Sequence, residues 1–487
     1  MAGGTRAEPT PWPLAALALI AFPAAVFYAW RLYVPCDDAY IHCVYARNFV
    51  EGRGLTYNGL VVEGFSSVLW VVALAGLGLT RIPIPELAEG LSTASGLLAL
   101  WATYILARRV LEDRWLALLP AALLAATGDF CFYMSVGLEQ VLFTAQVALS
   151  VALALWPRDG RPRVSWGFAL LLACMLLTRP EGALIAALVL ALMAAGGRAW
   201  GVAFKQGLLL TALMAPVLIA RRLVFGYWLP NTYYVKADAG LANLPHGIAY
   251  LEGAGFRYGA VLAALVALLA WRLLQRRPLG RARPLLIVSA AWLASVAVQG
   301  GDNMVGGRML VPVLPLVYAA LVLLARDVLG SRGALAAGAL LVPALVLGHR
   351  ADADVRDHAE VWRKSAIIRR KAGLYLREHF PPDTVVALNP AGMIPYYSGL
   401  PTIDMLGLND PAIAHHGKRD YSLVYGHQAG DGLYVLSRRP QVILLNSLPA
   451  PVPSHCISDQ ELWASPEFHA AYAVERWPGI GDAFIRK

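Results

Sequence analysis

The sequence has few charged residues and few cysteines, and each shortage excludes a class of protein. Only 15% of the 487 residues are charged whereas 58% are hydrophobic, which is too apolar for an ordinary soluble enzyme. The five cysteines form no CxxC pair and no metal-ligand spacing, so the sequence gives no support for a disulfide framework or a zinc finger. The formal net charge of +9 comes largely from basic residues that flank apolar runs. It therefore indicates membrane topology and anionic lipid, and no nucleic-acid partner.

Long apolar runs recur from Pro13 to about Leu347 and then stop. The rest of the chain has ordinary globular composition and enough length for one small domain. We therefore predict a polytopic α-helical membrane protein with about 11 spans over residues 1–349, followed by a small extracytoplasmic α/β domain over residues 350–487. The run from Leu14 to Trp30 lacks a small-residue cleavage site, so a retained span is favoured over a signal peptide.

The basic residues of the apolar region predict its topology. The positive-inside rule places three basic clusters in the cytoplasm. They are Arg108-Arg109 with Arg114; Arg158, Arg161 and Arg163; and Arg272, Arg276, Arg277, Arg281 and Arg283. The N-terminus is then cytoplasmic, whereas the first outer loop (residues 34–87) and the C-terminal domain are extracytoplasmic. This assignment requires Ser66–Thr80 to be a re-entrant or interfacial helix, since one more crossing would invert every basic cluster.

Two adjacent carboxylates, Asp37 and Asp38, follow the first span. Ionised groups are costly near hydrocarbon, so carboxylates at this place are often functional. They open an amphipathic segment that ends at Val50 and is suited to a helix along the membrane surface. An equally good interpretation of the pair is a helix N-cap, because Asp readily accepts a backbone N–H there.

Further polar residues gather on the predicted outer side. They are Glu63, Glu139, Arg179, Glu181, Arg221, Arg222, Asn231, Lys236, Asp302 and Arg308. Each alone is explained by a helix cap, a solvated loop or an interfacial anchor. Together they predict a mixed-charge cavity in which carboxylates activate a hydroxyl and cations hold a phosphate.

These residues fall into blocks that resemble polyprenyl-phosphate-dependent GT-C glycosyltransferases, and in particular the terminal arabinofuranosyltransferases of mycobacteria and related bacterial proteins. The blocks cover nearly the whole chain, and their number, order and shared membrane side make the match specific. They are Asp37-Asp-Ala-Tyr-Ile41, Tyr45-Ala-Arg-Asn48, Gly52-Arg-Gly54, Val62-Glu-Gly-Phe-Ser66, Leu69-Trp70, Gly137-Leu-Glu139, Thr178-Arg-Pro-Glu-Gly182, Pro230-Asn-Thr-Tyr-Tyr-Val-Lys236, Gly300-Gly-Asp302, Arg308-Met-Leu-Val-Pro312, Ile403-Asp-Met-Leu-Gly-Leu-Asn-Asp410 and Gly426-His427. The C-terminal domain is shorter than in the mycobacterial enzymes, which puts a carbohydrate-binding role for it in doubt.

The resemblance implies a glycosyltransferase of the bacterial inner membrane. It would move a sugar, with arabinofuranose suggested by the nearest relatives, from a polyprenyl-phosphate donor to an envelope glycan, a glycolipid or a protein. Asp37 or Asp38 stands where the family places its catalytic carboxylate, and Arg179, Lys236 and Arg308 are candidates to stabilise the leaving phosphate. The full set of predicted substrate-binding residues is Tyr40, Arg47, Glu63, Glu139, Arg179, Glu181, Asn231, Lys236, Asp302, Arg308, Asp410 and His427.

The sequence leaves cofactor and stereochemistry open. A divalent metal at Asp37 and Asp38 is an alternative to a metal-free site, which a phosphomonoester donor slightly favours. Direct displacement would invert the anomeric centre and a covalent carboxylate intermediate would retain it. A metal at His415-His416 or His427 has little support, because no cysteine stands at a matching spacing.

The C-terminal domain is predicted to begin with a helix over Arg356–Phe380. Thr384–Leu388 and Val442–Leu445 are candidate buried strands, and Asn389-Pro-Ala-Gly392 is a tight turn into another helix. Asp410 and His427 either line the roof of the cavity or merely pack the domain on the membrane part. Two other functions compete with transfer: a lipid or sugar transporter, which should show inverted repeats, and a non-enzymatic envelope scaffold.

Overall fold

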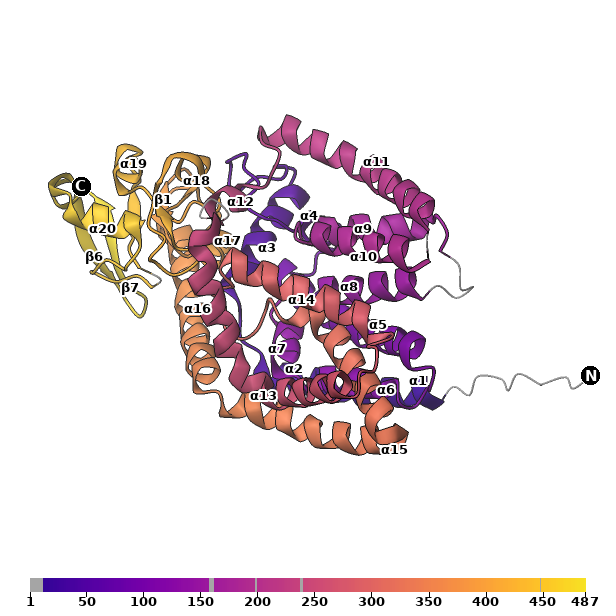
Figure 1. Ribbon diagram of the computed structural model, residues 1–487. Helices are drawn as coiled ribbons and strands as arrows, with labels where there is room; N and C mark the ends of the chain where they lie inside the picture. Colours follow the sequence, from indigo (N-terminus) through magenta and orange to yellow (C-terminus); the bar gives the residue numbers. More distant parts are fainter. Residues whose placement is uncertain (1–11, 157–161, 198, 237–239, 447) are drawn as a thin grey trace, which may run out of the picture.

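The computed structural model describes residues 12–156, 162–197, 199–236, 240–446 and 448–487. Helices occupy the chain as far as His379, and a small sheet with short helices follows. Figure 1 shows this C-terminal part at one end of the helical part, while the first described helix lies at the opposite end. Arg158 and Arg161, two of the predicted cytoplasmic residues, lie outside the described residues.

The helical part is built from apolar helices of very different lengths. Their bounds are α1 Trp12–Ala16, α2 Phe22–Leu32, α3 Asp37–Val50, α4 Val68–Gly78, α5 Ile84–Leu111, α6 Leu118–Ala125, α7 Gly128–Ser135, α8 Gln140–Leu155, α9 Trp166–Thr178, α10 Gly182–Gly197, α11 Trp200–Phe225, α12 Asn231–Lys236, α13 Leu244–Leu274, α14 Ala282–Gln299 and α15 Leu314–Ala351. A π-helical turn, Leu17–Ala21, joins α1 to α2, and α15 is kinked at Gly330, whose φ of 72° a residue with a side chain rarely adopts.

Within the described ranges, five helical segments are long and apolar enough to cross a membrane: Ile84–Leu111, Trp200–Phe225, Gly240–Leu274, Ala282–Gln299 and Val311–Ala351. Two pairs of helices bent by 101° and 69° raise the number to seven if each pair is one span. Four more apolar helices have 10–17 residues. The chain is thus a multi-pass α-helical protein, as predicted, and the figure of about eleven spans stays a prediction.

Segment α4 is the predicted re-entrant or interfacial helix. It has 11 residues, which at 1.5 Å per residue is about half the thickness of the hydrocarbon core. Its side chains Trp70 and Leu74 are fully buried against α3 and α5, together with Cys43 and Ala88. The length and the packing both favour a helix that does not cross, and its membrane position stays a prediction.

The predicted cytoplasmic segments meet at one end of the helical part. Arg109 donates to the carbonyl of Trp156 at 2.7 Å, and Arg281 pairs with Glu112 at 2.6 Å. The contacts join the end of α5 and the loop after it to the end of α8 and to the loop before α14. Arg109 and Arg281, from the first and third basic clusters, therefore lie at one end of the helical part, which the positive-inside rule would place in the cytoplasm.

The C-terminal part follows the long helix α16, Ala353–His379, and contains the predicted strands. Its five-stranded sheet has the order β2-β1-β5-β7-β6, with β1, β2 and β5 parallel and β6 and β7 antiparallel. The remaining bounds are β1 Val386–Leu388, α17 Met393–Ser398, β2 Thr402–Asp404, α18 Pro411–His416, β3 Lys418–Arg419, β4 Ala429–Gly430, α19 Gly432–Ser437, β5 Val442–Leu444, α20 Ile457–Ala464, α21 Pro466–Ala471, β6 Tyr472–Trp477 and β7 Gly481–Arg486. The predicted helix, both strands and the turn into α17 are confirmed.

The first outer loop and the C-terminal domain share one hydrophobic core. Tyr45 of α3 and Tyr57 and Phe65 of the loop are buried in the same cluster as Leu388 of β1 and Trp477 of β6. The Tyr57 hydroxyl donates to the carbonyl of Ala391 at 2.7 Å. Because this core is continuous, the domain is fixed against α3 and the loop that follows it, and the site forms between them.

Candidate active site

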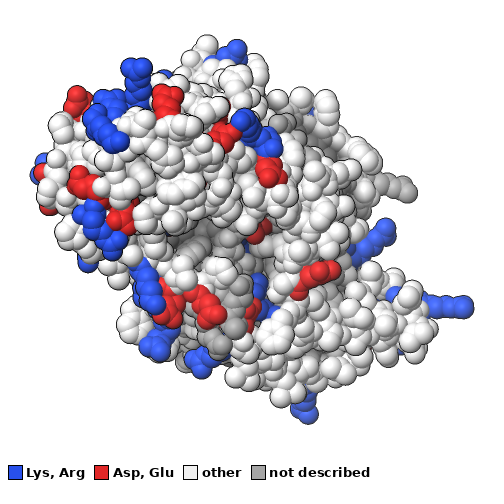
Figure 2. All heavy atoms as spheres, turned by 90° about the vertical axis from the view of Figure 1, so that its left-hand side faces the viewer, with Lys and Arg blue, Asp and Glu red and all other residues white. Residues whose placement is uncertain are grey.

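A cavity of about 220 Å³ lies between the start of α3 and the C-terminal domain. Asp37 and Asp38 form one wall, and Lys236 at the end of α12 lies in the same lining with His427. The others are Cys36, Ile41, Asn303, Met304, Trp362, Arg369, Asn389, Pro390, Ala391, Leu406, Leu408, Gly426 and Cys456. Figure 2 shows that the face carrying the C-terminal domain is hollowed near its middle and bears both acidic and basic side chains.

Asp37 binds the protein itself. Its carboxylate accepts backbone N–H bonds from Gly392 and Met393, each at 3.0 Å, and lies 3.6 Å from Arg369 of α16. Gly392 and Met393 begin α17, so Asp37 caps that helix from another part of the chain. The predicted N-cap of the helix that the acidic pair opens is wrong, because Cys36 is the N-cap residue of α3 and no side chain among the residues described caps it; Asp37 caps α17 instead.

Asp38 has different surroundings although it is the next residue. It makes no hydrogen bond or ion pair with any other residue in the described ranges, and its side chain is half-buried in the cavity wall. Its charge is felt by Lys236, Arg308 and His427, whose protonated forms it favours. An unengaged carboxylate beside cations is suited to act as a general base.

Lys236 supplies the cation of the cavity. Its ammonium has no hydrogen bond or ion pair with another residue among those described, and burial lowers its pKa, with Arg308 adding to that effect. Burial likewise lowers the pKa of His427 to about 4, so its imidazole is neutral at neutral pH. Lys236 is therefore the predicted phosphate-binding residue that has a charge available on the cavity surface.

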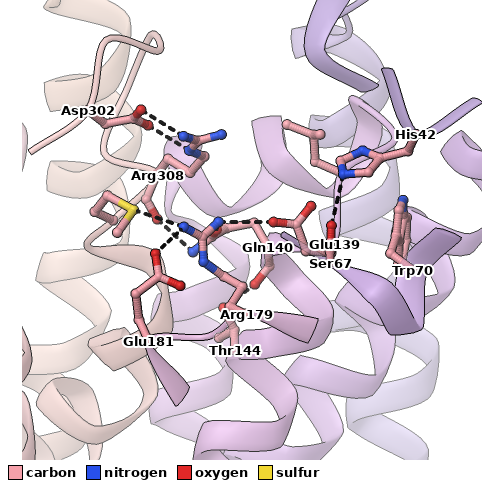
Figure 3. Close-up of polar contacts among 12 residues, drawn as sticks. His42, Ser67, Trp70, Glu139, Gln140, Thr144, Arg179, Glu181, Asp302 and Arg308 are labelled. Carbon is pink, nitrogen blue, oxygen red and sulfur yellow. Dashed lines mark hydrogen bonds and ion pairs between the residues drawn. The ribbon is translucent and has the colours of Figure 1, made fainter. Parts of the chain in front are cut away.

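The predicted arginines are paired with carboxylates deeper in the helical part (Figure 3). Arg179 lies between Glu139 and Glu181 and contacts one oxygen of each at 2.9 Å. Arg308 pairs with Asp302 at 2.6 Å. Because carboxylates already balance their charges and neither side chain is part of the cavity lining, these arginines are not placed to bind a ligand within the cavity.

His42 extends this polar layer, and the sequence reasoning missed it. The side chain is buried on α3, and its Nε2 lies 2.8 Å from the Ser67 hydroxyl, as Figure 3 shows. Trp70 donates to the carbonyl of Gly137 at 3.2 Å in the same region. The spacing of Asp38 and His42, one helical turn apart, was the available signal.

Other predicted binding residues lie outside the cavity lining and join elements to one another. Tyr40 contacts the Tyr397 hydroxyl at 3.2 Å, and Arg47 donates to the carbonyl of Tyr396, so both fasten α3 to α17. Asn231 donates to the carbonyls of Gly407 and Leu408 at 2.8 and 3.0 Å. Their predicted contact with substrate stays a prediction, and each has a structural partner.

Glu63 and Asp410 also have partners within the protein. Glu63 receives two hydrogen bonds from Arg221, at 2.6 and 3.0 Å, and Arg222 donates to the carbonyl of Gly226 at the end of α11. Asp410 caps α18 and accepts from Ala412 and Ile413. Arg221 and Arg222 lie on the predicted outer side, where the positive-inside rule does not expect basic residues. Arg221 binds a carboxylate of the protein, and Arg222 binds the end of a helix.

Sequence reasoning missed the cavity residues that come from far along the chain. Trp362 and Arg369 enter from α16, Asn303 from the loop after α14, and Cys456 from the start of α20. Neither Asp37 nor Asp38 belongs to a three-residue cluster that could hold a metal, among the residues described. His415 stacks on Tyr227 with ring centroids 4.1 Å apart and is not part of the cavity lining.

Comparisons with known proteins support the fold. No curated protein matches the chain in sequence, and a family model described as "Domain of unknown function (DUF8728)" matches residues 356–482. The structure of ArnT from Cupriavidus metallidurans bound to undecaprenyl phosphate is similar, with 13% identity, a TM-score of 0.58 and coverage of 81% of this chain and 86% of ArnT. The structure of ArnT from the same organism in the apo state is also similar. Its sequence identity is 14%, its TM-score is 0.54, and the match covers 80% of this chain and 86% of ArnT. The chain therefore shares the fold of ArnT.

Proposed function

We propose that the protein is an integral-membrane glycosyltransferase that moves a sugar from a polyprenyl-phosphate donor to a hydroxyl of an acceptor, with Asp38 as general base. One observation carries the proposal. Asp38, a carboxylate with no hydrogen bond or ion pair within the described chain, shares a cavity with Lys236, a similarly unpaired ammonium. Base and cation are the two groups that transfer from a sugar phosphate requires.

The chemistry assigns a task to each group. Asp38 takes the proton of the acceptor hydroxyl while the oxygen attacks the anomeric carbon of the donor. The bond from that carbon to the phosphate oxygen breaks, and the phosphate monoester that leaves gains charge, which Lys236 stabilises. Arg179 and Arg308, whose charges are balanced by carboxylates, hold the polar layer outside the cavity lining in place.

Direct displacement is favoured over a covalent intermediate. A double displacement needs one carboxylate as nucleophile and a second group as acid and base. Asp37, the neighbouring carboxylate, is occupied by two backbone N–H groups and Arg369. A single unengaged carboxylate supports one step, which would invert the anomeric centre.

The donor class rests on the fold and the sequence together. One ArnT structure of this fold contains undecaprenyl phosphate, and we extend that lipid class to this chain. Apolar helices next to the cavity suit a polyprenyl tail. Arabinofuranose comes only from the sequence resemblance, and the acceptor would be an envelope glycan, a glycolipid or a protein on the extracytoplasmic side of a bacterial inner membrane.

The proposal is tested with the full-length protein in detergent and a panel of radiolabelled polyprenyl-phosphate sugars. We expect turnover of one donor by the wild type and none above background by Asp38→Asn, with acceptor fractions from bacterial envelopes added in turn. Equal turnover by both proteins would contradict the role of Asp38. Absence of binding to every donor, measured by retention of label, would contradict the donor class and favour the transporter or scaffold alternatives.

A further inference from the structure

His427, His455 and Cys456 form a second cluster at the edge of the cavity. Among the residues described they are the only group of three His, Cys, Asp or Glu residues suited to a metal, and their ligand atoms lie within 4.8 Å of one another. His427 and Cys456 are part of the cavity lining. His455 is exposed to solvent, whereas Cys456 is buried. The cluster is therefore reachable from outside and also faces the reaction space.

The separation of the two imidazole nitrogens fits a tetrahedral metal. His427 Nδ1 lies 3.3 Å from His455 Nε2, and their rings are stacked with centroids 5.5 Å apart. Two nitrogens bound to Zn²⁺ at about 2.0 Å in a tetrahedron are themselves about 3.3 Å apart. Imidazole and thiolate are ligands of zinc and similar cations, while Mg²⁺ and Ca²⁺ prefer oxygen.

Neighbouring residues hold the ligands in place. Asp459 of α20 accepts from the backbone N–H of Ser454 at 2.9 Å and of Asn446 at 2.8 Å, which fixes the loop that leads to His455 and Cys456. On the other side, Asn303 Nδ2 lies 3.4 Å from His427 Nε2. The amide oxygen and nitrogen are interchangeable by rotation, so Asn303 is placed to accept from Nε2–H while Nδ1 binds a metal.

We propose that His427, His455 and Cys456 bind one zinc ion whose fourth position is open to the cavity. Cys456 would bind as thiolate, and its proton would leave to solvent when the ion binds. Three protein ligands with one open position are the arrangement of catalytic zinc sites. The role of the ion rests on the proposed function: at the open position it would bind a phosphate oxygen of the lipid-linked donor, in the cavity that contains Asp38 and Lys236.

The test measures metal binding by the full-length protein in detergent. The protein is stripped with a chelator, reloaded with Zn²⁺ and desalted, and its metal is counted by mass spectrometry. We expect one zinc ion per chain in the wild type, loss in Cys456→Ser and His455→Ala, and full retention in His416→Ala, an exposed histidine outside the cluster. Loading with Co²⁺ should give a thiolate charge-transfer band that Cys456→Ser lacks.

Because His455 is exposed, His455→Ala removes a ligand with little risk to folding, and thermal unfolding of each variant checks this. A wild type without bound zinc, or zinc retained in both ligand variants, would overturn the inference. The transfer assay is separate. Zinc bound without transfer of any sugar contradicts only the proposed function, whereas transfer by a protein that binds no zinc contradicts only the metal site.

Discussion

At the scale of single residues, Asp37 and Asp38 show how neighbours in sequence acquire different roles. Successive residues of a helix point about 100° apart, so Asp37 caps α17 at the cavity wall while the carboxylate of Asp38 is left without a partner among the described residues. We expect Asp38→Asn to lower transfer by roughly 10²–10⁴-fold with unchanged stability. Asp37→Asn should cost about 1–2 kcal/mol of stability, because α17 loses its cap. Thermal unfolding and transfer by the two purified variants measure both effects.

The two variants serve as controls for each other, since each removes one negative charge from the same helical turn. A loss of stability in Asp38→Asn equal to that in Asp37→Asn would contradict the assignment. Full transfer activity in Asp38→Asn would contradict the role of Asp38 as general base.

Asp404, at the end of β2, predicts how the stability of the C-terminal domain depends on pH. Its carboxylate accepts from Leu406 and from the backbone and side chain of Asn409, yet burial raises its pKa to about 6. An acid whose pKa is raised by folding stabilises the fold when protonated. The contribution of Asp404 to the free energy of unfolding is complete below pH 3.8 and is lost as the pH rises through about 6. The largest loss is about 3 kcal/mol.

The measurement is the unfolding temperature of wild type and Asp404→Asn from pH 4 to pH 7. Asn cannot ionise, so the difference between the two proteins should shrink as the pH rises, even if Asn lowers stability throughout. A difference that is constant with pH, or that grows with it, would show that the pKa of Asp404 is not raised.

The role of a residue was predictable where its sequence neighbours indicate that role. The convergence of Asp37, Asp38, Lys236 and His427 on one cavity agrees with the blocks seen in the sequence. Asp410 before a proline is a recognisable helix cap, and it caps α18. The pair of Arg179 with Glu139 joins residues 40 positions apart and the pair of His427 with His455 joins residues 28 positions apart, and only the fold brings them together.

At the scale of elements, the contact between α3 and α17 positions the site. The N-terminus of α17 lies directly on α3, so a Cβ at Gly392 would overlap the backbone oxygen of Asp37. We expect Gly392→Ala to displace α17, lower stability by roughly 1–3 kcal/mol and weaken transfer. Gly90→Ala is the matched control, because its Cβ on α5 meets open space and alanine favours helix.

Thermal unfolding and limited proteolysis of both variants measure the effect. Greater cleavage of the C-terminal domain in Gly392→Ala than in Gly90→Ala would agree with displacement of α17. Equal stability of the two would contradict a close contact at Gly392.

Helices and strands with strong composition signals were predictable, as α16, β1 and β5 illustrate. The short α4 was predictable because the basic clusters leave no room for another crossing. The 69° bend between α6 and α7 coincides with Thr127-Gly-Asp129, which interrupts the apolar run, but the angle of the bend was not predictable. Packing against other helices decides such a bend, and periodicity in one segment does not contain that information.

At the scale of the whole molecule, charge and hydrophobicity divide the chain into two ends. One end carries the basic loops that contact each other through Arg109 and Arg281, and the other carries the cavity and the sheet. The division follows from the positive-inside pattern and was predictable. The docking of the first outer loop on the C-terminal domain was not, because Tyr57 and Trp477 are 420 positions apart (477 minus 57) and nothing local relates them.

The two ends should lie on opposite sides of the membrane. Gln275→Cys in a basic loop and Asp383→Cys in the C-terminal domain replace exposed residues, so each adds an accessible thiol at one end. We expect a membrane-impermeant maleimide to label Asp383→Cys in intact cells and Gln275→Cys only after permeabilisation. The unmodified protein gives the background, since Cys36, Cys43, Cys131 and Cys456 are buried and Cys174 is half-buried.

Labelling of both thiols in intact cells would mean that both ends face outward, which contradicts the predicted orientation. Labelling of Gln275→Cys alone would invert the topology and place the cavity in the cytoplasm. A polyprenyl-phosphate sugar presented from the outer leaflet would then have no access to Asp38. The orientation of the chain and the leaflet of its donor are therefore a single question, and this pair of thiols addresses it without any knowledge of the sugar.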